Sequence, residues 1–237
     1  MRADSNLPFG RNYREFMFAW LKNLLQGERS VGGFSPESSL DSLPYTVVDT
    51  ELTSLDSRSN RILSIGAVGM AGRKILFGKQ FYRIINPGVP VPEKTVLIHG
   101  LRPIDISEGE SPGNAIAEFV EFTRGTMLVG HFLSTDLAAL RKEAGDGKNF
   151  RVPAIDTARI QWWLDRQRQT SREDRGHEVE RVDLMSLAAR YGLSVGDVHH
   201  ALEDAFVTAQ LWQRLMAELE KLGIKTLRPV LRASNKG

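Results

Sequence analysis

The chain has 237 residues, and 31 Lys and Arg against 29 Asp and Glu leave a formal net charge of +2. Its length fits one sizeable domain with an appendage, and 41% hydrophobic with 25% charged residues is the composition of an ordinary globular protein. The absence of cysteine excludes disulfides, thiolate nucleophiles and the usual structural zinc sites, while the near-neutral charge balance neither requires nor excludes a nucleic acid partner.

Residues 1–42 are predicted to form an amphipathic helix and a linker. Between residues 11 and 26, apolar side chains recur every three or four positions, as in Phe16, Trp20 and Leu24. Residues 30–39 are small and polar with Pro and Gly, which is typical of a linker. We expect the helix to pack back on the domain. The alternative is that it docks a protein partner or a second copy of the chain in a homodimer.

No membrane contact is expected from the sequence. The first residues lack the apolar core of a signal peptide, and no stretch approaches the ~20 apolar residues that span a bilayer. The absence of cysteine fits a reducing compartment. These features predict a cytoplasmic protein.

A domain of the α/β class is predicted over residues 43–223. Strands are expected near residues 45–51, 61–70, 74–85, 126–131 and 152–157. Helices are expected at 112–124, from 136 onward, at 158–167, 183–191 and 201–222, with a helix or turn at 92–101. The second and third strands should pair antiparallel, because only the Gly-containing turn at residues 71–73 separates them. This order predicts a mixed sheet covered by helices.

Two segments are expected to lie outside this framework. Residues 166–176 mix both charges without an apolar period, which predicts a solvated loop. Its arginines, among them Arg166, Arg168 and Arg172, are able to contact phosphates. The basic tail over residues 224–237 is expected to fray.

A pair of acidic residues ends the first strand. Because side chains alternate along a strand, Asp49 and Glu51 point to the same side. Two like charges in one place raise a pKa or require a compensating cation. Hard oxygen ligands without cysteine favour Mg²⁺ or Mn²⁺ over Zn²⁺. The alternative is an acidic turn that caps the next element.

Two further carboxylates and a pair of histidines fall at helix starts. Asp136 follows the strand at 126–131, and Asp204 lies one turn into the last helix beside apolar neighbours. Taken singly, Asp136 is equally explained as a charge at a helix N-terminus, and Asp204 as a polar residue on a helix flank. Together with the first acidic pair, they predict a two-metal site that hydrolyses a phosphodiester. His199 is the predicted general base, because imidazole exchanges a proton near neutral pH, and its neighbour His200 is the competing candidate.

Three segments resemble the motifs of the DEDDh 3′→5′ exonucleases. They are Val48-Asp49-Thr50-Glu51, Leu128-Val129-Gly130-His131 followed by Asp136, and His199-His200-Ala201-Leu202-Glu203-Asp204. The likeness covers residues 44–220 in the family's motif order. It is similar in particular to the epsilon (proofreading) subunit of bacterial DNA polymerase III and its stand-alone relatives. The resemblance implies a ribonuclease-H-like fold with a five-stranded mixed sheet.

The resemblance also implies the roles of individual residues. Two Mg²⁺ ions, which Mn²⁺ would replace, would be held by Asp49, Glu51, Asp136 and Asp204, with His199 as general base. The residues implied to bind substrate are Thr50, Leu52, Thr53, His99, His131 and Phe132. The His99-Gly100 pair is similar to the His-Gly that the family places near the 3′-terminal nucleotide. Phe132 and Thr135 differ, because the family commonly has Asn and an aromatic residue there.

The predicted function is therefore a metal-dependent exonuclease. It would hydrolyse phosphodiester bonds from the 3′ end of DNA, with single strands expected, and release nucleoside 5′-monophosphates. One alternative is the same chemistry on RNA 3′ ends, since no residue marks recognition of the 2′-OH. A second alternative is a non-catalytic interaction module that keeps the fold, against which the intact carboxylates and His199 argue.

Overall fold

A computed structural model describes residues 33–54, 56–145, 153–169, 182–196 and 199–235. At its centre is a five-stranded mixed sheet with the strand order β3-β2-β1-β4-β5. The strands are β1 (Pro44–Leu52), β2 (Ile62–Ala71), β3 (Lys74–Ile84), β4 (Met127–Gly130) and β5 (Ala154–Asp156). Strands β1, β2 and β3 pair antiparallel, whereas β4 runs parallel to both β1 and β5. The predicted mixed sheet and its antiparallel hairpin are confirmed.

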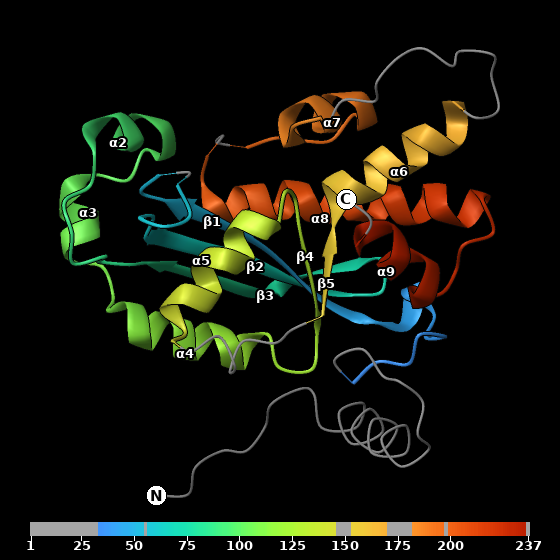
Figure 1. Cartoon of the computed structure of the whole chain (residues 1–237), viewed down its shortest axis with the longest axis horizontal. Helices are drawn as coiled ribbons and strands as arrows, with labels where there is room; N and C mark the ends of the chain where they lie inside the picture. The colour runs from blue at the N-terminus through green and yellow to red at the C-terminus, as the bar shows by residue number, and fades with distance from the viewer. Residues whose placement is uncertain (1–32, 55, 146–152, 170–181, 197–198, 236–237) are drawn as a thin grey trace, which may run out of the picture.

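Helices cover both faces of the sheet (Figure 1). On one face lie α4 (Pro112–Phe122) and α5 (Ser134–Glu143), and the opposite face carries α6 (Thr157–Gln169), α7 (Leu184–Tyr191), α8 (Ala201–Lys221) and α9 (Leu227–Asn235). Two short helices, α2 (Glu93–His99) and α3 (Pro103–Ser107), lie beyond one end of the sheet, and a 3-10 turn spans Leu40–Ser42. Within the described residues, no helix combines the length and apolar character needed to cross a bilayer.

The alternation of side chains along β1 divides the core into two layers. Tyr45 and Val47 belong to the cluster that packs against α8, whereas Val48 belongs to the cluster that packs against α4 and α5. This is the period of two that a strand covered on both faces requires. Continuing the period places Asp49 and Glu51 on the α8 side of the sheet.

Helix α8 approaches the sheet closely at Gly66 of β2. A Cβ atom built on this glycine would lie 2.1 Å from the backbone nitrogen of Leu202 and 2.2 Å from the carbonyl carbon of Ala201. Such distances are far below van der Waals contact. Only a residue without a side chain therefore allows the start of α8 to rest on the strand at this point.

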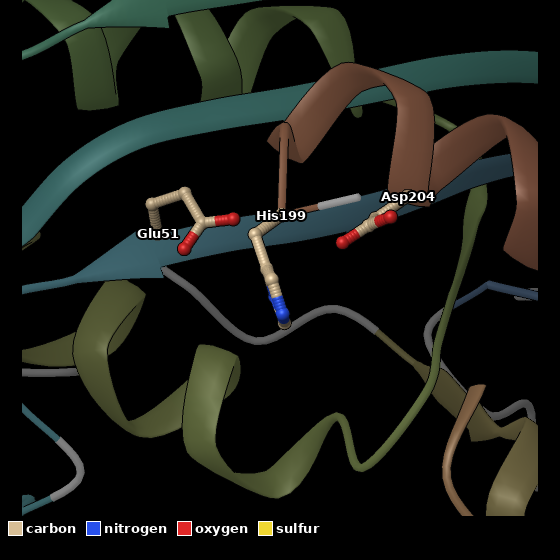
Figure 2. Close-up of side chains that lie close together, drawn as sticks. All are labelled: Glu51, His199 and Asp204. Atoms are coloured by element: carbon tan, nitrogen blue, oxygen red, sulfur yellow. The ribbon is translucent and has the colours of Figure 1, made fainter. Parts of the chain in front are cut away.

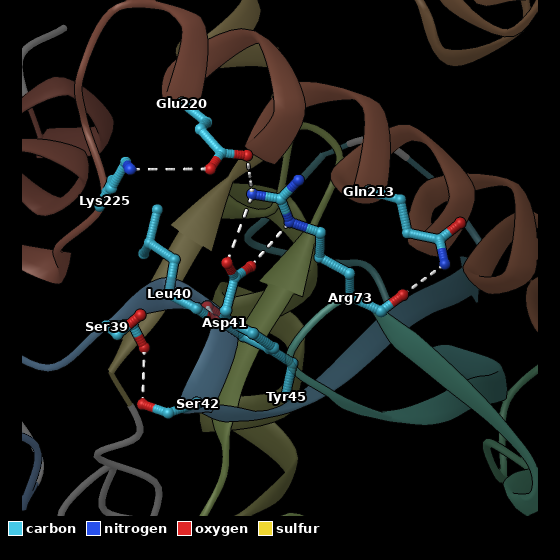
Figure 3. A network of polar contacts seen from close by, with 9 residues as sticks. All are labelled: Ser39, Leu40, Asp41, Ser42, Tyr45, Arg73, Gln213, Glu220 and Lys225. Atoms are coloured by element: carbon cyan, nitrogen blue, oxygen red, sulfur yellow. Dashed lines mark hydrogen bonds and ion pairs between the residues drawn. The ribbon is translucent and has the colours of Figure 1, made fainter.

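Arg73 ties together segments that are distant in sequence (Figure 3). From the β2–β3 turn, its guanidinium donates to Asp41 Oδ1 at 2.7 Å and to Glu220 Oε2 near the end of α8, also at 2.7 Å. Its backbone carbonyl accepts a bond from the Gln213 side chain. The N-terminal part of the described chain is thereby fixed to α8.

The expected linker and frayed tail are wrong for the residues described. Phe34 and Leu40 are buried in the core, and the Leu40 N–H donates to the Lys225 carbonyl. The tail forms α9, whose Leu227 and Val230 are also buried. Leu227 and Val230 are spaced as on one face of a helix. The prediction of a frayed tail rested instead on the segment's positive charge and its terminal position. The predicted helix at 11–26 lies outside the described residues.

The loop predicted from residue 166 is wrong for residues 166–169, and the rest of the predicted segment lies outside the described residues. Helix α6 continues to Gln169, so Arg166 and Arg168 lie on its last turn. Arg168 pairs with Glu218 of α8 at 2.6 Å, and Arg166 lies over the Trp162 ring. Basic residues near a helix C-terminus are favoured by the helix dipole. The loop was predicted from the lack of apolar periodicity alone, and that criterion takes no account of the dipole. Arg172 lies outside the described residues.

We predict that Gly66→Ala lowers the free energy of unfolding by about 2 kcal/mol or more, because overpacking at a rigid backbone contact forces the helix to shift. Gly78→Ala on neighbouring β3 is the matched control, since a Cβ there meets nothing within 4 Å. Urea unfolding of both variants measures the difference. Equal stability of the two variants would contradict the close approach of α8.

Candidate active site

The acidic residues of the first motif lie where β1 ends. Because β1 and β4 are parallel, their carboxyl ends meet at one edge of the sheet, which is where sites form in open sheets of this kind. Asp136 lies in the first turn of α5, just after β4. Its Oδ1 accepts a hydrogen bond of 2.6 Å from the Thr50 hydroxyl, which joins the end of β1 directly to the first turn of α5.

The third motif brings its residues to the same place from α8. Asp204 lies in the first turn of that helix, where its N–H donates to the His200 carbonyl at 2.9 Å. One potential ligand atom from each of Glu51, His199 and Asp204 lies within 4.8 Å of the others. Figure 2 shows Glu51 extending from β1, with His199 between it and Asp204. Residues 150 positions apart in sequence thus form one cluster.

The carboxylates raise one another's pKa values. Burial raises the pKa of Asp49 well above its ordinary value, and the charges of Asp136, Glu51 and Asp204 raise it further. Burial raises the pKa of Glu51 to about 8, again with contributions from Asp204 and Asp136. All four carboxylates therefore share one electrostatic field, including Asp49 and Asp136, which lie outside the tight group of three.

Neighbouring groups partly offset the rise in the pKa values of the remaining two carboxylates, Asp136 and Asp204. Burial raises the pKa of Asp136 to about 7, while the hydrogen bond from Thr50 opposes the rise. Burial also raises the pKa of Asp204, and the charge of His199 opposes this effect. Hydrogen bonds and a neighbouring imidazole offset only part of the cost of collecting four carboxylates.

The donor set fits a divalent metal ion. Asp204 Oδ1 is buried and has no hydrogen-bond partner among the described residues, an arrangement that is unfavourable unless another group binds there. Carboxylate oxygens with no cysteine are ligands for hard cations. A bound cation would also replace the repulsion among the carboxylates with attraction of each carboxylate to the cation.

Two residues beside the site have left-handed backbone conformations. Phe132 has φ of 53° and His199 has φ of 63°, and no other non-glycine residue of the described chain has positive φ. Each residue comes just before a helix whose first turn carries an acidic site residue, Asp136 or Asp204. Such conformations cost about 1–3 kcal/mol and persist only where surrounding contacts hold them.

The predicted pocket residues after Glu51 lie beside α2. The Thr95 hydroxyl of α2 donates to the Thr53 carbonyl at 3.1 Å, and Leu52 is the last residue of β1. His99 is buried, its Nδ1 accepts a bond from the Leu101 N–H, and its Nε2 has no partner among the described residues. Burial lowers the pKa of His99. Substrate binding by these residues, and by Thr50, stays a prediction.

His131 packs between β4, α6 and the residues before α7. Its Nδ1 shares a hydrogen bond of 2.9 Å with the Thr157 hydroxyl, and its Nε2 lies 3.1 Å from the Val182 carbonyl. Both ring nitrogens thus have protein partners, and substrate binding by His131 stays a prediction. Phe132, which is 36% exposed, packs its ring edge to face against His131 and keeps its predicted role as a proposal.

His200 and His199 have separate surroundings. The His200 ring stacks on Tyr82 of β3, with ring centroids 4.7 Å apart and planes inclined by 25°. His199 instead lies with Glu51 and Asp204. Sequence reasoning missed Tyr82 and Gly66, because neither belongs to an acidic motif and only the strand register places them beside the site.

Comparisons with known proteins decide the family. The family model described as "Exonuclease" (RNase_T) matches residues 46–212, most of the described domain. The chain belongs to this exonuclease family. It is 30% identical over 199 residues to a DNA polymerase III subunit epsilon-like protein of Rhodobacter capsulatus, an alignment that covers 82% of this chain and 27% of the relative. It is 25% identical over 177 residues to DNA polymerase III subunit epsilon of Aquifex aeolicus, covering 74% of this chain and 81% of that subunit.

Solved structures show the same fold. Escherichia coli exonuclease I in complex with a dT13 oligonucleotide matches with a TM-score of 0.65 at 14% identity, over 77% of this chain and 43% of that one. Exonuclease X in complex with 5′-overhanging duplex DNA matches with a TM-score of 0.56 at 19% identity, over 81% of this chain and 99% of that one. This exonuclease-family chain thus spans less than half the length of exonuclease I, and about a quarter of the Rhodobacter relative. The ribonuclease-H-like fold expected from the motifs is confirmed.

We predict that the metal-free protein loses stability as pH rises from about 5 to 8. The folded-state pKa of Glu51, about 8, exceeds its ordinary value of 4.5, so its stabilising contribution is complete below the ordinary value and is lost as pH rises through the folded one. The expected loss is about 1–3 kcal/mol. Urea unfolding in EDTA at several pH values measures it.

Glu51→Gln should flatten this pH dependence, and saturating Mg²⁺ should reduce it in the unsubstituted protein. Glu93→Gln, at an exposed position on α2, is the control and should keep the original slope. An unchanged slope in Glu51→Gln would show that this carboxylate is not held in the repulsive field described here.

Proposed function

We propose that the chain is a 3′→5′ exonuclease that uses two Mg²⁺ ions to hydrolyse phosphodiester bonds. The single observation that supports this most strongly is the convergence of the three motifs at one edge of the sheet. Potential ligand atoms of Glu51, His199 and Asp204 lie within 4.8 Å of one another, and Asp136 of the middle motif is hydrogen-bonded to Thr50 beside them. Membership of the exonuclease family supports the same activity. Products would be nucleoside 5′-monophosphates.

The proposed metal ligands are Asp49, Glu51, Asp136 and Asp204, and Mn²⁺ is expected to replace Mg²⁺. Bound metal ions would polarise the phosphodiester and stabilise the charge that develops on its oxygens. The protein contributes the fixed positions of the ligands, with Asp136 held by Thr50. Without cations the carboxylates repel one another. We therefore expect bound metal ions to stabilise the site.

His199 is the proposed general base. It lies with Glu51 and Asp204, where its imidazole would accept the proton of the attacking water. A base in reach of its proton typically contributes about 10²–10⁴ in rate. His200 is not suited to this role, because its ring is stacked on Tyr82 and its Nδ1 is buried.

DNA is the proposed substrate, with single-stranded 3′ ends preferred. The supporting observations are the names of relatives: epsilon subunits of DNA polymerase III, and structures of exonucleases in complex with DNA. An exoribonuclease is the second candidate, because the described site residues include none assigned to the 2′-OH, which is the group that distinguishes RNA from DNA.

The proposed function is tested with matched all-DNA and all-RNA oligonucleotides labelled at the 5′ end. With Mg²⁺, a ladder of products shortened from the 3′ end and release of mononucleotides are expected, faster for DNA. A 3′-phosphorothioate linkage should slow the ladder. Internal cleavage, or activity unaffected by EDTA, would contradict the proposal.

We predict that Asp49→Ala and Asp204→Ala each abolish Mg²⁺-dependent hydrolysis with the fold intact, because each removes a proposed metal ligand. Circular dichroism and single-turnover nuclease assays measure the two properties. Asp56→Ala is the control: the Asp56 carboxylate is exposed and, within the described residues, accepts hydrogen bonds from the Arg58 N–H and the Ser59 hydroxyl, so near wild-type turnover is expected. Near wild-type turnover in Asp49→Ala would refute the metal assignment.

We predict that His199→Ala lowers kcat by about 10²–10⁴ with little change in KM, as loss of a general base requires. His200→Ala should have a smaller effect on kcat, since its ring contacts Tyr82 rather than the carboxylates. Steady-state kinetics of the two variants compares them. A larger loss for His200→Ala would show that the base is assigned to the wrong histidine.

A further inference from the structure

Three residues form a row across the sheet beneath the start of α8. Asp49 of β1 pairs with Gly66 of β2, and Gly66 pairs in turn with Tyr82 of β3. Directly paired residues place their side chains on the same face, which here is the face covered by α8. Asp49, a proposed metal ligand, therefore lies beside Gly66, which contacts the backbone of α8, and Gly66 lies beside Tyr82.

The start of α8 lies along this row. The backbone of Ala201 and Leu202 rests on Gly66, and the ring of the preceding residue, His200, stacks on Tyr82. These two contacts together fix the direction in which the helix leaves the segment that carries His199.

Within the described residues, the cap position of α8 is held by packing and not by a side-chain hydrogen bond. No side-chain hydrogen bond caps the helix at His200 among the described residues, and caps of this kind normally contribute about 1 kcal/mol. His200 Nδ1 is also buried without a partner there, so the ring is held by packing. The adjacent residue, His199, nevertheless has φ of 63°, a conformation that surrounding contacts must maintain.

We propose that Tyr82 is a positioning residue for hydrolysis. Its ring, acting through the ring of His200, holds the start of α8 so that His199 stays in its left-handed conformation beside Glu51 and Asp204. Tyr82 has no contact with the reacting atoms in this account. The inference rests on the proposed function for its kinetic consequence, while its structural part does not depend on activity.

Kinetics of three variants test the positioning role. Tyr82→Leu, which removes the stacked ring, should lower kcat by about 10- to 100-fold, the scale expected for a small misplacement of a catalytic group. KM should change little. Tyr82→Phe keeps the ring and should restore kcat to near the wild-type value. Equal losses in the two variants would assign the effect to the hydroxyl group and overturn the proposal.

The chain offers a matched control for the ring stack. Phe77 of β3 stacks on Phe206 of α8 at 5.8 Å with planes inclined by 20°, which joins the same two elements without touching His200. Phe77→Leu should leave kcat unchanged. A loss as large as that of Tyr82→Leu would show that any weakening of the β3–α8 contact has the same effect, and would overturn a specific role for Tyr82.

A double-variant cycle separates positioning of His199 from general damage. If Tyr82 acts through His199, then Tyr82→Leu should cost little further activity once His199→Ala has removed the base. Additive losses in the double variant would overturn the proposed route. Thermal unfolding of every variant verifies that the compared proteins are folded at the assay temperature.

Hydrogen exchange provides a readout that needs no activity. The Asp204 amide donates to the His200 carbonyl, so loosening of the helix start should speed its exchange. We expect faster exchange at the Asp204 amide in Tyr82→Leu, and wild-type rates in Tyr82→Phe and Phe77→Leu. Unchanged exchange in Tyr82→Leu would overturn the inference. An inactive wild-type protein with the expected exchange pattern would instead overturn only the proposed function.

Discussion

The repulsion among four carboxylates is the constraint on which the site depends. Asp49 and Glu51 come from one strand end, and Asp136 and Asp204 come from two helix starts. Burial raises the pKa of all four carboxylates, and the charges of the neighbouring carboxylates raise the pKa values of Asp49 and Glu51 further. Such an arrangement opposes folding of the metal-free protein. Bound cations would make the arrangement favourable. The four carboxylates that destabilise the metal-free protein are therefore also the proposed metal ligands.

The rest of the fold supplies the rigidity that this cluster requires. The sheet is covered on both faces, and the rows of paired residues across it give fixed positions for β1 and β3 relative to α8. Gly66 admits the helix backbone, while Arg73 holds the far end of the helix through Glu220. Strained conformations at Phe132 and His199 are sustained within this frame, as is common where function sets backbone geometry.

The acidic motifs were predictable from sequence because their spacing reflects local geometry. The period of a strand places Asp49 and Glu51 on one side, and a helix start explains Asp136 and Asp204. The Tyr82–His200 stack was not predictable, since it depends on how the start of α8 packs on β3, between residues over 100 positions apart. The engagement of His131 by Thr157 and Val182 likewise arises from tertiary packing. Helix α9 was not predicted, because the prediction for the tail relied on its basic composition and not on the helical spacing of Leu227 and Val230.

Electron paramagnetic resonance of bound Mn²⁺ detects the cation that the carboxylates are proposed to require. We expect two ions bound per chain in the presence of a nucleoside 5′-monophosphate, loss of binding in Asp49→Asn, and retention in Asp56→Asn, at an exposed carboxylate outside the cluster. Absence of binding to the unsubstituted protein, or binding that Asp49→Asn leaves unchanged, would contradict the proposed metal site.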